Sequence, residues 1–296
     1  MKASINKVFT WISDYEKWKK PIGVGLILFL ALIQIWIFYI RYCPRSDWTL
    51  TFYPAANDLF IKNIYDCAVY CYFYPVWALF PIYLFSYLPV HLSNTIISVL
   101  CLTIVGYIAY KRGAKPFALA LYIFMPQVQF MALNGDFIDV FTSIGFILPP
   151  QIGLFFVLAK PQAGFAVALF WLAEAWQNGK IKEVFKVFAP VTLAYALMLI
   201  MFSPNMINTL LVAPKIIDAP WDANIWPYGM IIGIALLGVA IRKHNLGLAI
   251  LASPCFFPYI GFYSWPIVLL GFLPNNFEFI IAIVVMCIIS LITGTY

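Results

Sequence analysis

Charged residues are scarce in this 296-residue sequence: Asp, Glu, Lys and Arg together make up only 10% of it. Ordinary globular domains carry about 25%. Hydrophobic residues make up 64% of the chain and aromatic residues 19%, which excludes a water-soluble surface. The sequence therefore predicts an all-α, polytopic membrane protein, a single membrane domain over residues 1–296 with roughly 8–10 membrane helices, some broken or interfacial.

Residues that hold metals are also scarce. The two histidines, His91 and His244, are not placed near candidate acids, and the six cysteines show no zinc or redox spacing. We expect no obligatory metal and no cofactor. Cys43, Cys67 and Cys71 lie close together in one polar region; they are free thiols or, in an oxidising compartment, partners in a disulfide.

The net charge of +6 is confined to short loops between apolar runs, so it indicates membrane orientation and not nucleic-acid binding. The positive-inside rule places every basic cluster in the cytoplasm, together with a tail at residues 1–20. We expect a prokaryotic plasma membrane. The clusters are Lys2 to Lys20, Lys111 to Lys115, Lys180 to Lys186, and Arg242 with Lys243.

The first apolar run, Ile22 to Ile40, contains no charged residue and is long enough to cross a bilayer. Aromatic residues crowd its end where a signal peptide has a small-residue cleavage site, so we interpret it as a retained helix. A first outer loop at residues 41–92 follows. Its apolar part, Ala68 to Leu88, is interrupted by prolines and is expected to form interfacial helices without crossing.

The cytoplasmic placement of the basic clusters then predicts where the chain crosses the membrane further on. We expect Phe137 to Ala159 to be split by Pro149 and Pro150 into pieces too short to cross, as is tolerated against protein or a water-filled cavity. Residues 203–228 form an outer loop, and Leu246 to Tyr296 makes two or three crossings. The predicted spans are Ser93 to Tyr110, Phe117 to Met131, Ala163 to Trp176, Val187 to Phe202 and Gly229 to Ile241.

Acidic residues gather on the predicted outer face. Asp58, Asp66, Asp218 and Asp222 are expected to solvate outer loops. Asp47, Asp136 and Asp139 each lie within a few residues of a membrane segment, where an ionisable group is costly and therefore a functional candidate.

Lys160 is a candidate cation at membrane level. It precedes Pro161, a residue suited to the first turn of a helix. A lysine beside a helix N-terminus makes an anion site suited to a phosphate, whereas the alternative is a side chain that snorkels to the interface. An acid-lined outer cavity with such a cation indicates a lipid-linked phosphate handled at the outer leaflet.

Several short motifs follow one another along the chain. They are Asp47 with Trp48, FYPAA from Phe52 to Ala56, YPVWALFP from Tyr74 to Pro81, Leu88 with Pro89, Gly135 with Asp136, KPQ at Lys160 to Gln162, and Ser253 with Pro254. In this order they resemble the motifs of glycosyltransferase family 87, a branch of the GT-C superfamily that includes polyprenol-phosphate-mannose-dependent mannosyltransferases. The resemblance covers roughly the first 180 residues. Val76 stands where the family has a second proline, Asp136 where it has glutamine, and the chain is short for the family.

The resemblance implies a GT-C-like helical bundle and an inverting transfer of a monosaccharide, a hexose such as mannose, from a polyprenyl-phosphate donor. The acceptor is a lipid or glycan at the outer leaflet. Asp47 stands at the position of the family's catalytic acid, and a carboxylate there can take the acceptor's proton. Lys160, with Gln162 or Arg45, is expected to hold the donor phosphate.

Other residues are expected to contact sugar or acceptor. Asp136 and Asp139 share a helical face, and they bind sugar hydroxyls or, as a lesser alternative, a divalent ion. For four aromatic residues, stacking on sugar or lining of a lipid groove competes with plain interface anchoring. These four are Tyr53, Tyr74, Trp77 and Trp226.

Two other functional classes are open at this point. A transporter or flippase of lipid-linked glycans shares broken helices and membrane-level charges, although its ionisable residues are expected near the midplane on several helices. A non-catalytic membrane scaffold leaves Asp47 dispensable.

Overall fold

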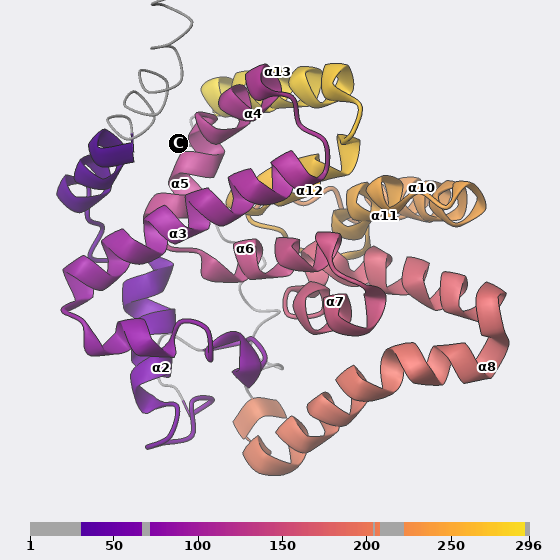
Figure 1. The fold of residues 1–296 in the computed structure, drawn as a ribbon, viewed down its shortest axis with the longest axis horizontal. Coiled ribbons are helices and arrows are strands. Elements are labelled where there is room, and N and C mark those ends of the chain that lie inside the picture. Colours follow the sequence, from indigo (N-terminus) through magenta and orange to yellow (C-terminus); the bar gives the residue numbers. More distant parts are fainter. Residues whose placement is uncertain (1–30, 67–71, 204, 208–221, 294–296) are drawn as a thin grey trace, which may run out of the picture.

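The computed structural model describes residues 31–66, 72–203, 205–207 and 222–293. This part of the chain is mostly helical and contains no strand, apart from an isolated bridge between Asp222 and Gly261. The predicted helical class is therefore confirmed. The helices pack around one another at varied angles (Figure 1).

The helical elements are mostly short, and many are single 3₁₀ turns; η1 is a π-helical turn. The first half of the chain contains η1 (Trp48–Phe52), α2 (Tyr53–Asp58), η2 (Val76–Ala78), η3 (Tyr83–Tyr87), α3 (Val90–Lys111), α4 (Pro116–Ile123), α5 (Pro126–Asn134), α6 (Phe137–Ile144), η4 (Gly145–Ile147) and α7 (Pro150–Val157). The second half contains α8 (Pro161–Phe202), α10 (Gly229–Lys243), α11 (Leu246–Ala252), η6 (Ser253–Phe256), η7 (Phe262–Ser264), α12 (Trp265–Leu269), η8 (Leu270–Phe272) and α13 (Asn276–Thr293).

Two helices of the described chain, α3 and α8, are long and apolar enough to cross a membrane. The pair α4 and α5 makes a third if the two are one bent span. The predicted helix from Ser93 to Tyr110 is α3. Of the predicted first helix, residues 31–40 are helical, and residues 22–30 lie outside the described part of the chain.

Prolines set the breaks in the middle of the chain. The predicted split of Phe137 to Ala159 is confirmed, because η4 ends at Ile147 and α7 begins at Pro150. The predicted span from Phe117 to Met131 is bent by 55° between α4 and α5. Pro126 begins α5 and forces Met125 into an extended conformation, which ends the preceding helix.

The helix α8 turns back on itself at Gly179 and Lys180, the only two residues in it with non-helical backbone angles. Its two arms are visible in Figure 1, joined by a bend at the right of the view. The arms match the two predicted spans, Ala163 to Trp176 and Val187 to Phe202. A sharp turn replaces the loop expected between them, with Lys180 in the left-handed region at φ 53°.

The first outer loop contains no long helix in its described residues. Residues 72–88 form only the 3₁₀ turns η2 and η3, so the described part of the run from Ala68 to Leu88 holds short turns where interfacial helices were expected. Residues 67–71 of that run lie outside the described chain, as do 204 and 208–221 of the predicted loop at 203–228.

The C-terminal region is folded from short pieces. Among the described residues after Leu246, no helix has the length and apolarity of a complete span, so the two or three crossings expected there are not present as single long helices. Pro254 and Pro266 lie at the starts of η6 and α12. These breaks let η7 and α12 pack against α5 and α6, which positions the site described next.

Arg112 joins three segments at the end of α3. Its guanidinium donates to the carbonyl oxygen of Leu270 at 3.0 Å and to that of Phe146 at 3.4 Å. Both carbonyls belong to short 3₁₀ turns. This contact ties η4 and η8 to α3.

Candidate functional site

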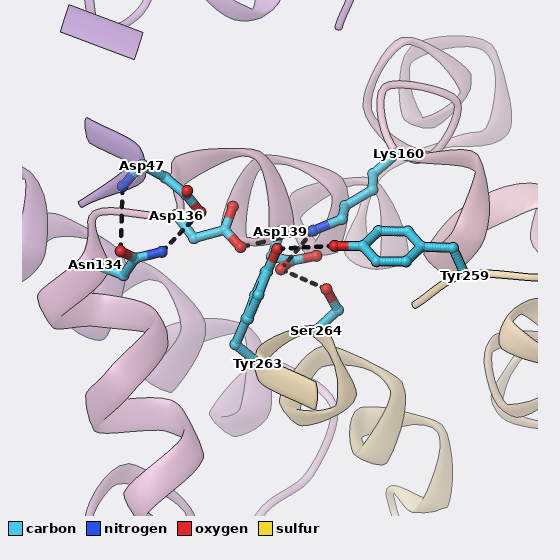
Figure 2. Close-up of polar contacts among 8 residues, drawn as sticks. All are labelled: Asp47, Asn134, Asp136, Asp139, Lys160, Tyr259, Tyr263 and Ser264. Atoms are coloured by element: carbon cyan, nitrogen blue, oxygen red, sulfur yellow. Dashed lines mark hydrogen bonds and ion pairs between the residues drawn. The ribbon is translucent and has the colours of Figure 1, made fainter. Parts of the chain in front are cut away.

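Asp47 is held by one side chain from a distant part of the sequence. It directly precedes η1, and its backbone N–H donates to Asn134 Oδ1 at 3.1 Å. Asn134 Nδ2 in turn donates to Asp47 Oδ2 at 2.7 Å. Figure 2 shows the two residues face to face. Backbone and carboxylate of Asp47 are thus fixed by the same amide.

Gly135 makes this approach possible. It caps α5 in the left-handed region with φ 64°, where a residue without Cβ is favoured. A Cβ at this position would lie 2.6 Å from Cβ of Trp48, the fully buried neighbour of Asp47. The conformation at Gly135 therefore presents Asn134 to Asp47 and starts α6 at Asp136.

A buried ion cluster lies beside Asp47 (Figure 2). Lys160 Nζ is 2.8 Å from Asp139 Oδ2 and 3.6 Å from Asp136 Oδ2. Asp136 precedes α6, Asp139 lies in its first turn, and Lys160 precedes Pro161 at the start of α8. Only 1% of Asp136, 0% of Asp139 and 3% of Lys160 is exposed to solvent.

The C-terminal region closes the cluster. Ser264 Oγ donates to Asp139 Oδ2 at 2.9 Å. The Lys160 ammonium lies 5.1 Å from the centre of the Tyr263 ring, within range of a cation–π contact. The hydroxyls of Tyr259 and Tyr263 are 3.4 Å apart. Residues from η1, α5, α6, the start of α8 and η7 thus meet at one place.

Acid exceeds base in this cluster. One lysine faces two carboxylates, with the third, Asp47, close enough to be influenced by Asp136 and Lys160. Asp136 Oδ2 and Asp139 Oδ1 are buried without a hydrogen-bond partner. Buried charges are stable only when they are paired and hydrogen-bonded, so the cluster favours binding of a proton or of a polar ligand group.

The carboxyl of Asp47 has a strongly shifted acidity. Burial raises its pKa from 3.8 to about 7, and the negative charge of Asp136 adds to the effect. Lys160 and the hydrogen bond from Asn134 lower the pKa and limit the rise. A carboxyl with a pKa near neutral pH can take up and release a proton under physiological conditions.

The other predicted site residues are placed less centrally. Arg45 is exposed, two residues before Asp47. Gln162 lies in the first turn of α8, and its Oε1 atom is buried without a hydrogen-bond partner. Trp226 is 39% exposed.

Three predicted aromatic residues have contacts that explain them structurally. The hydroxyl of Tyr53 donates to the Leu88 carbonyl at 3.0 Å, and Trp77 Nε1 donates to the Phe155 carbonyl at 2.9 Å. The ring of Tyr74 stacks on that of Phe52. Of the three, Tyr74 is also influenced by the charges of the cluster.

Two expectations for Lys160 change. Its side chain points inward and is buried, so it does not snorkel to an interface. Nor is it an isolated cation at a helix N-terminus, because Asp139 and Asp136 already balance its charge. Nothing in the sequence pattern showed that the predicted phosphate-binding lysine and the predicted sugar-binding acids are partners.

The remaining acids and thiols differ from one another. Asp58 forms an exposed ion pair with Lys62, and Asp66 is exposed, as expected of solvated acids. Asp222 instead accepts a hydrogen bond from the Ile260 N–H at 3.0 Å, so it has a structural role. Cys43 is a free thiol. Asp218, Cys67 and Cys71 lie outside the described residues.

No group of three or more His, Cys, Asp or Glu side chains in the described part of the chain has the arrangement of a metal site. At Asp136 and Asp139, the Lys160 ammonium occupies the place between the carboxylates. This arrangement disfavours the divalent ion considered as a lesser alternative for these two acids.

Sequence reasoning missed Asn134, Ser264, Tyr259 and Tyr263. Asn134 directly precedes the Gly135–Asp136 motif, and a polar residue at the end of an apolar helix is a signal that could have singled it out. The other three belong to an aromatic run without charged residues. Only the packing of η7 against α5 identifies them.

Comparison of the chain with known protein families, with characterised proteins and with solved structures found no match. The motifs of the sequence and the geometry of the site are therefore the features that indicate a function.

Proposed function

We propose that the protein is an integral membrane glycosyltransferase that moves a monosaccharide from a polyprenyl-phosphate donor to a lipid or glycan acceptor at the outer leaflet, with inversion. The observation that carries the proposal is the Asp47 carboxyl. It is partly accessible, oriented by two hydrogen bonds to Asn134, and has a pKa of about 7.

The proposed chemistry requires one base. Asp47 accepts the proton of the acceptor hydroxyl while the acceptor oxygen forms a bond to the anomeric carbon. The bond from that carbon to the phosphate oxygen breaks, and the oxygen keeps the electron pair. Because polyprenyl phosphate is already a good leaving group, no second carboxyl is needed as a general acid, unlike in glycoside hydrolases.

The positively charged residues have different parts in this proposal. Arg45 is exposed close to Asp47, so it is the cation best placed to meet a donor phosphate at the surface. Lys160 is bound to two carboxylates. Its charge offsets part of the negative charge of the acid cluster and so reduces the repulsion of an anionic donor, which is a weaker role than direct phosphate binding.

The placement of basic residues supports the proposed polytopic architecture, with the N-terminus in the cytoplasm. His244, next to Arg242 and Lys243, contacts Glu174 of α8 at 2.6 Å. This contact brings the turn after α10 to the arm of α8 that leads to the cluster at Lys180. Basic residues far apart in the sequence therefore gather on one side, which favours a single cytoplasmic face.

The test is a transfer assay in proteoliposomes with a radiolabelled polyprenyl-phosphate mannose and a lipid acceptor extract. We expect Asp47→Asn to lower the rate by about 10²-fold or more, the size of a general-base contribution. Asp58→Asn is the matched control and should retain the wild-type rate, because Asp58 is a partly exposed acid in the same loop that forms an ion pair with Lys62.

Transfer by folded Asp47→Asn protein at the wild-type rate would exclude Asp47 as the base. Absence of transfer by the wild-type protein, with mannose and with other hexose donors, would count against the proposed function.

The second candidate, a transporter or flippase of lipid-linked glycans, is favoured by one observation. Asp136, Asp139 and Lys160 are buried at the starts of α6 and α8, on either side of the broken segment α6 to α7. Buried ionisable residues at interrupted helices are a feature of transporters. Movement of labelled lipid across the same proteoliposomes without sugar transfer would favour this candidate.

A further inference from the structure

One amide forms both hydrogen bonds to Asp47. The N–H of Asp47 must face an oxygen, and its carboxylate must face a donor. Asn134 satisfies both with Oδ1 at 3.1 Å and Nδ2 at 2.7 Å. The opposite orientation of the amide would lose both bonds, so the arrangement determines which amide atom is oxygen.

The backbone that carries Asn134 is itself firmly held. Met131 and Ala132, in the preceding turn of α5, are fully buried. The following residue, Gly135, is left-handed and has no room for a side chain beside Trp48. Asn134 therefore has little freedom to move, and its amide restrains the orientation of the Asp47 carboxylate.

We infer that Asn134 is a positioning residue that orients the Asp47 carboxylate and stabilises its charged form. This inference rests on the proposed function, in which the charged carboxylate is the active base. The amide has no part in bond making; it acts only through Asp47.

Two groups favour the charged form of Asp47, first the Lys160 ammonium and then the Asn134 amide. Asp136 opposes ionisation of Asp47, and Lys160 favours it while shared with Asp136 and Asp139. The hydroxyls of Tyr74 and Tyr263 lie in the same field and are neutral at physiological pH. Asn134 is thus a neutral donor bound directly to the carboxylate, and its removal leaves burial and Asp136 to favour the protonated form.

The test compares pH–rate profiles of transfer for Asn134→Ala and Asn134→Asp with the wild type. Asn134→Asp keeps an oxygen for the Asp47 N–H but replaces the amide donor by a second negative charge. We expect Asn134→Ala to move the acidic limb of the profile upward by about one pH unit, which is a tenfold loss of rate on that limb. Asn134→Asp should move it further.

Gln129→Ala is the matched control. Gln129 lies on the same helix, and its amide contacts Gln34 and the Ile123 carbonyl, away from Asp47. We expect its profile to match that of the wild type. A general destabilisation of α5 would lower the rate at every pH without moving the limb.

A second measurement keeps this inference separate from the proposed function. Infrared titration of the carboxyl band that disappears in Asp47→Asn measures ionisation of Asp47 with no substrate present. If the wild type transfers no sugar, the proposed function fails, and an upward shift of this titration in Asn134→Ala still shows that Asn134 stabilises the charged carboxylate. An unchanged titration in Asn134→Ala and Asn134→Asp overturns the inference.

Discussion

At the scale of single residues, some neighbours of Asp47 favour its protonated carboxyl and others favour its carboxylate. Burial and the charge of Asp136 favour the protonated carboxyl, whereas Lys160 and Asn134 favour the carboxylate. Such a balance near neutral pH suits a group that must both take up and release a proton. The same balance makes the folded protein less stable, because an acid with a raised pKa is costly to ionise.

This cost predicts how stability depends on pH. The folded-state pKa of Asp47 is about 7, against an ordinary value of 3.8, so the folded protein holds a proton that the unfolded chain has lost between these values. The free energy of unfolding therefore falls as pH rises from about 4 to about 7. With about 1.4 kcal/mol per pH unit, reduced for the partial exposure of Asp47, the loss is about 2 kcal/mol.

Asp47→Asn lacks the ionisable group and should escape this loss. In thermal unfolding of detergent-solubilised protein, we expect its Tm to exceed that of the wild type at pH 8 and to match it at pH 4. Asp58→Asn should follow the wild type at both values. If the Tm of the wild type and that of Asp47→Asn depend on pH in the same way, ionisation of Asp47 carries no cost in the folded state.

At the scale of elements, the site depends on the corner between α5 and α6. Asn134, Gly135 and Asp136 are consecutive, yet Asn134 binds Asp47 whereas Asp136 faces Lys160. The left-handed conformation of Gly135 separates the directions of the two side chains. If α5 continued as a helix through this corner, Asn134 and Asp136 would lie on the same helix, and either the contact with Asp47 or the contact with Lys160 would be lost.

Substitution of this glycine tests the corner. Gly135→Ala adds a Cβ 2.6 Å from that of Trp48 in a left-handed conformation, and we expect a loss of about 2–4 kcal/mol of stability from strain and overpacking. Gly238→Ala is the control, since a Cβ there meets nothing within 4 Å on the helix α10. The readout is the Tm of each purified variant.

A Gly135→Ala variant as stable as Gly238→Ala would mean that the corner is not held as described. Transfer activity should fall with Gly135→Ala as well, because the strain is relieved by movement of η1, which Asp47 directly precedes.

At the scale of the whole molecule, the segment that follows Asp47 and the bend of α8 lie at opposite ends of the fold. α2, which follows Asp47 and η1, lies at the left of Figure 1, and the bend of α8 with its lysines lies at the right. In the proposed membrane orientation, these two ends face opposite sides of the bilayer.

Single cysteines test this orientation in a background where the six native cysteines are replaced by serine. Arg45 and Lys182 are both exposed, so Arg45→Cys and Lys182→Cys are matched probes. In intact cells, a membrane-impermeant maleimide should label the first and not the second, and permeabilisation should expose both. The reverse pattern would invert the topology and place Asp47 in the cytoplasm.

The sequence by itself determined the helical class, the split at Pro149 and Pro150, and the choice of Asp47, Asp136, Asp139 and Lys160 as candidates. These features follow from composition, proline chemistry and the cost of charge in an apolar segment, which are local properties. The predicted break at these prolines is present, whereas the bend at Pro126, inside the predicted span from Phe117 to Met131, was not predicted.

Only the tertiary structure decided which residues meet. Asn134 reaches Asp47 across 87 positions of sequence, and Ser264 reaches Asp139 across 125. Such pairs depend on how helices pack, and an uncharged Asn or Ser in an apolar run carries no periodic signal. The structure likewise shows that Lys160 is the ion-pair partner of two acids and not an isolated phosphate ligand. The physical reason is that a buried charge is costly unless an opposite charge lies beside it.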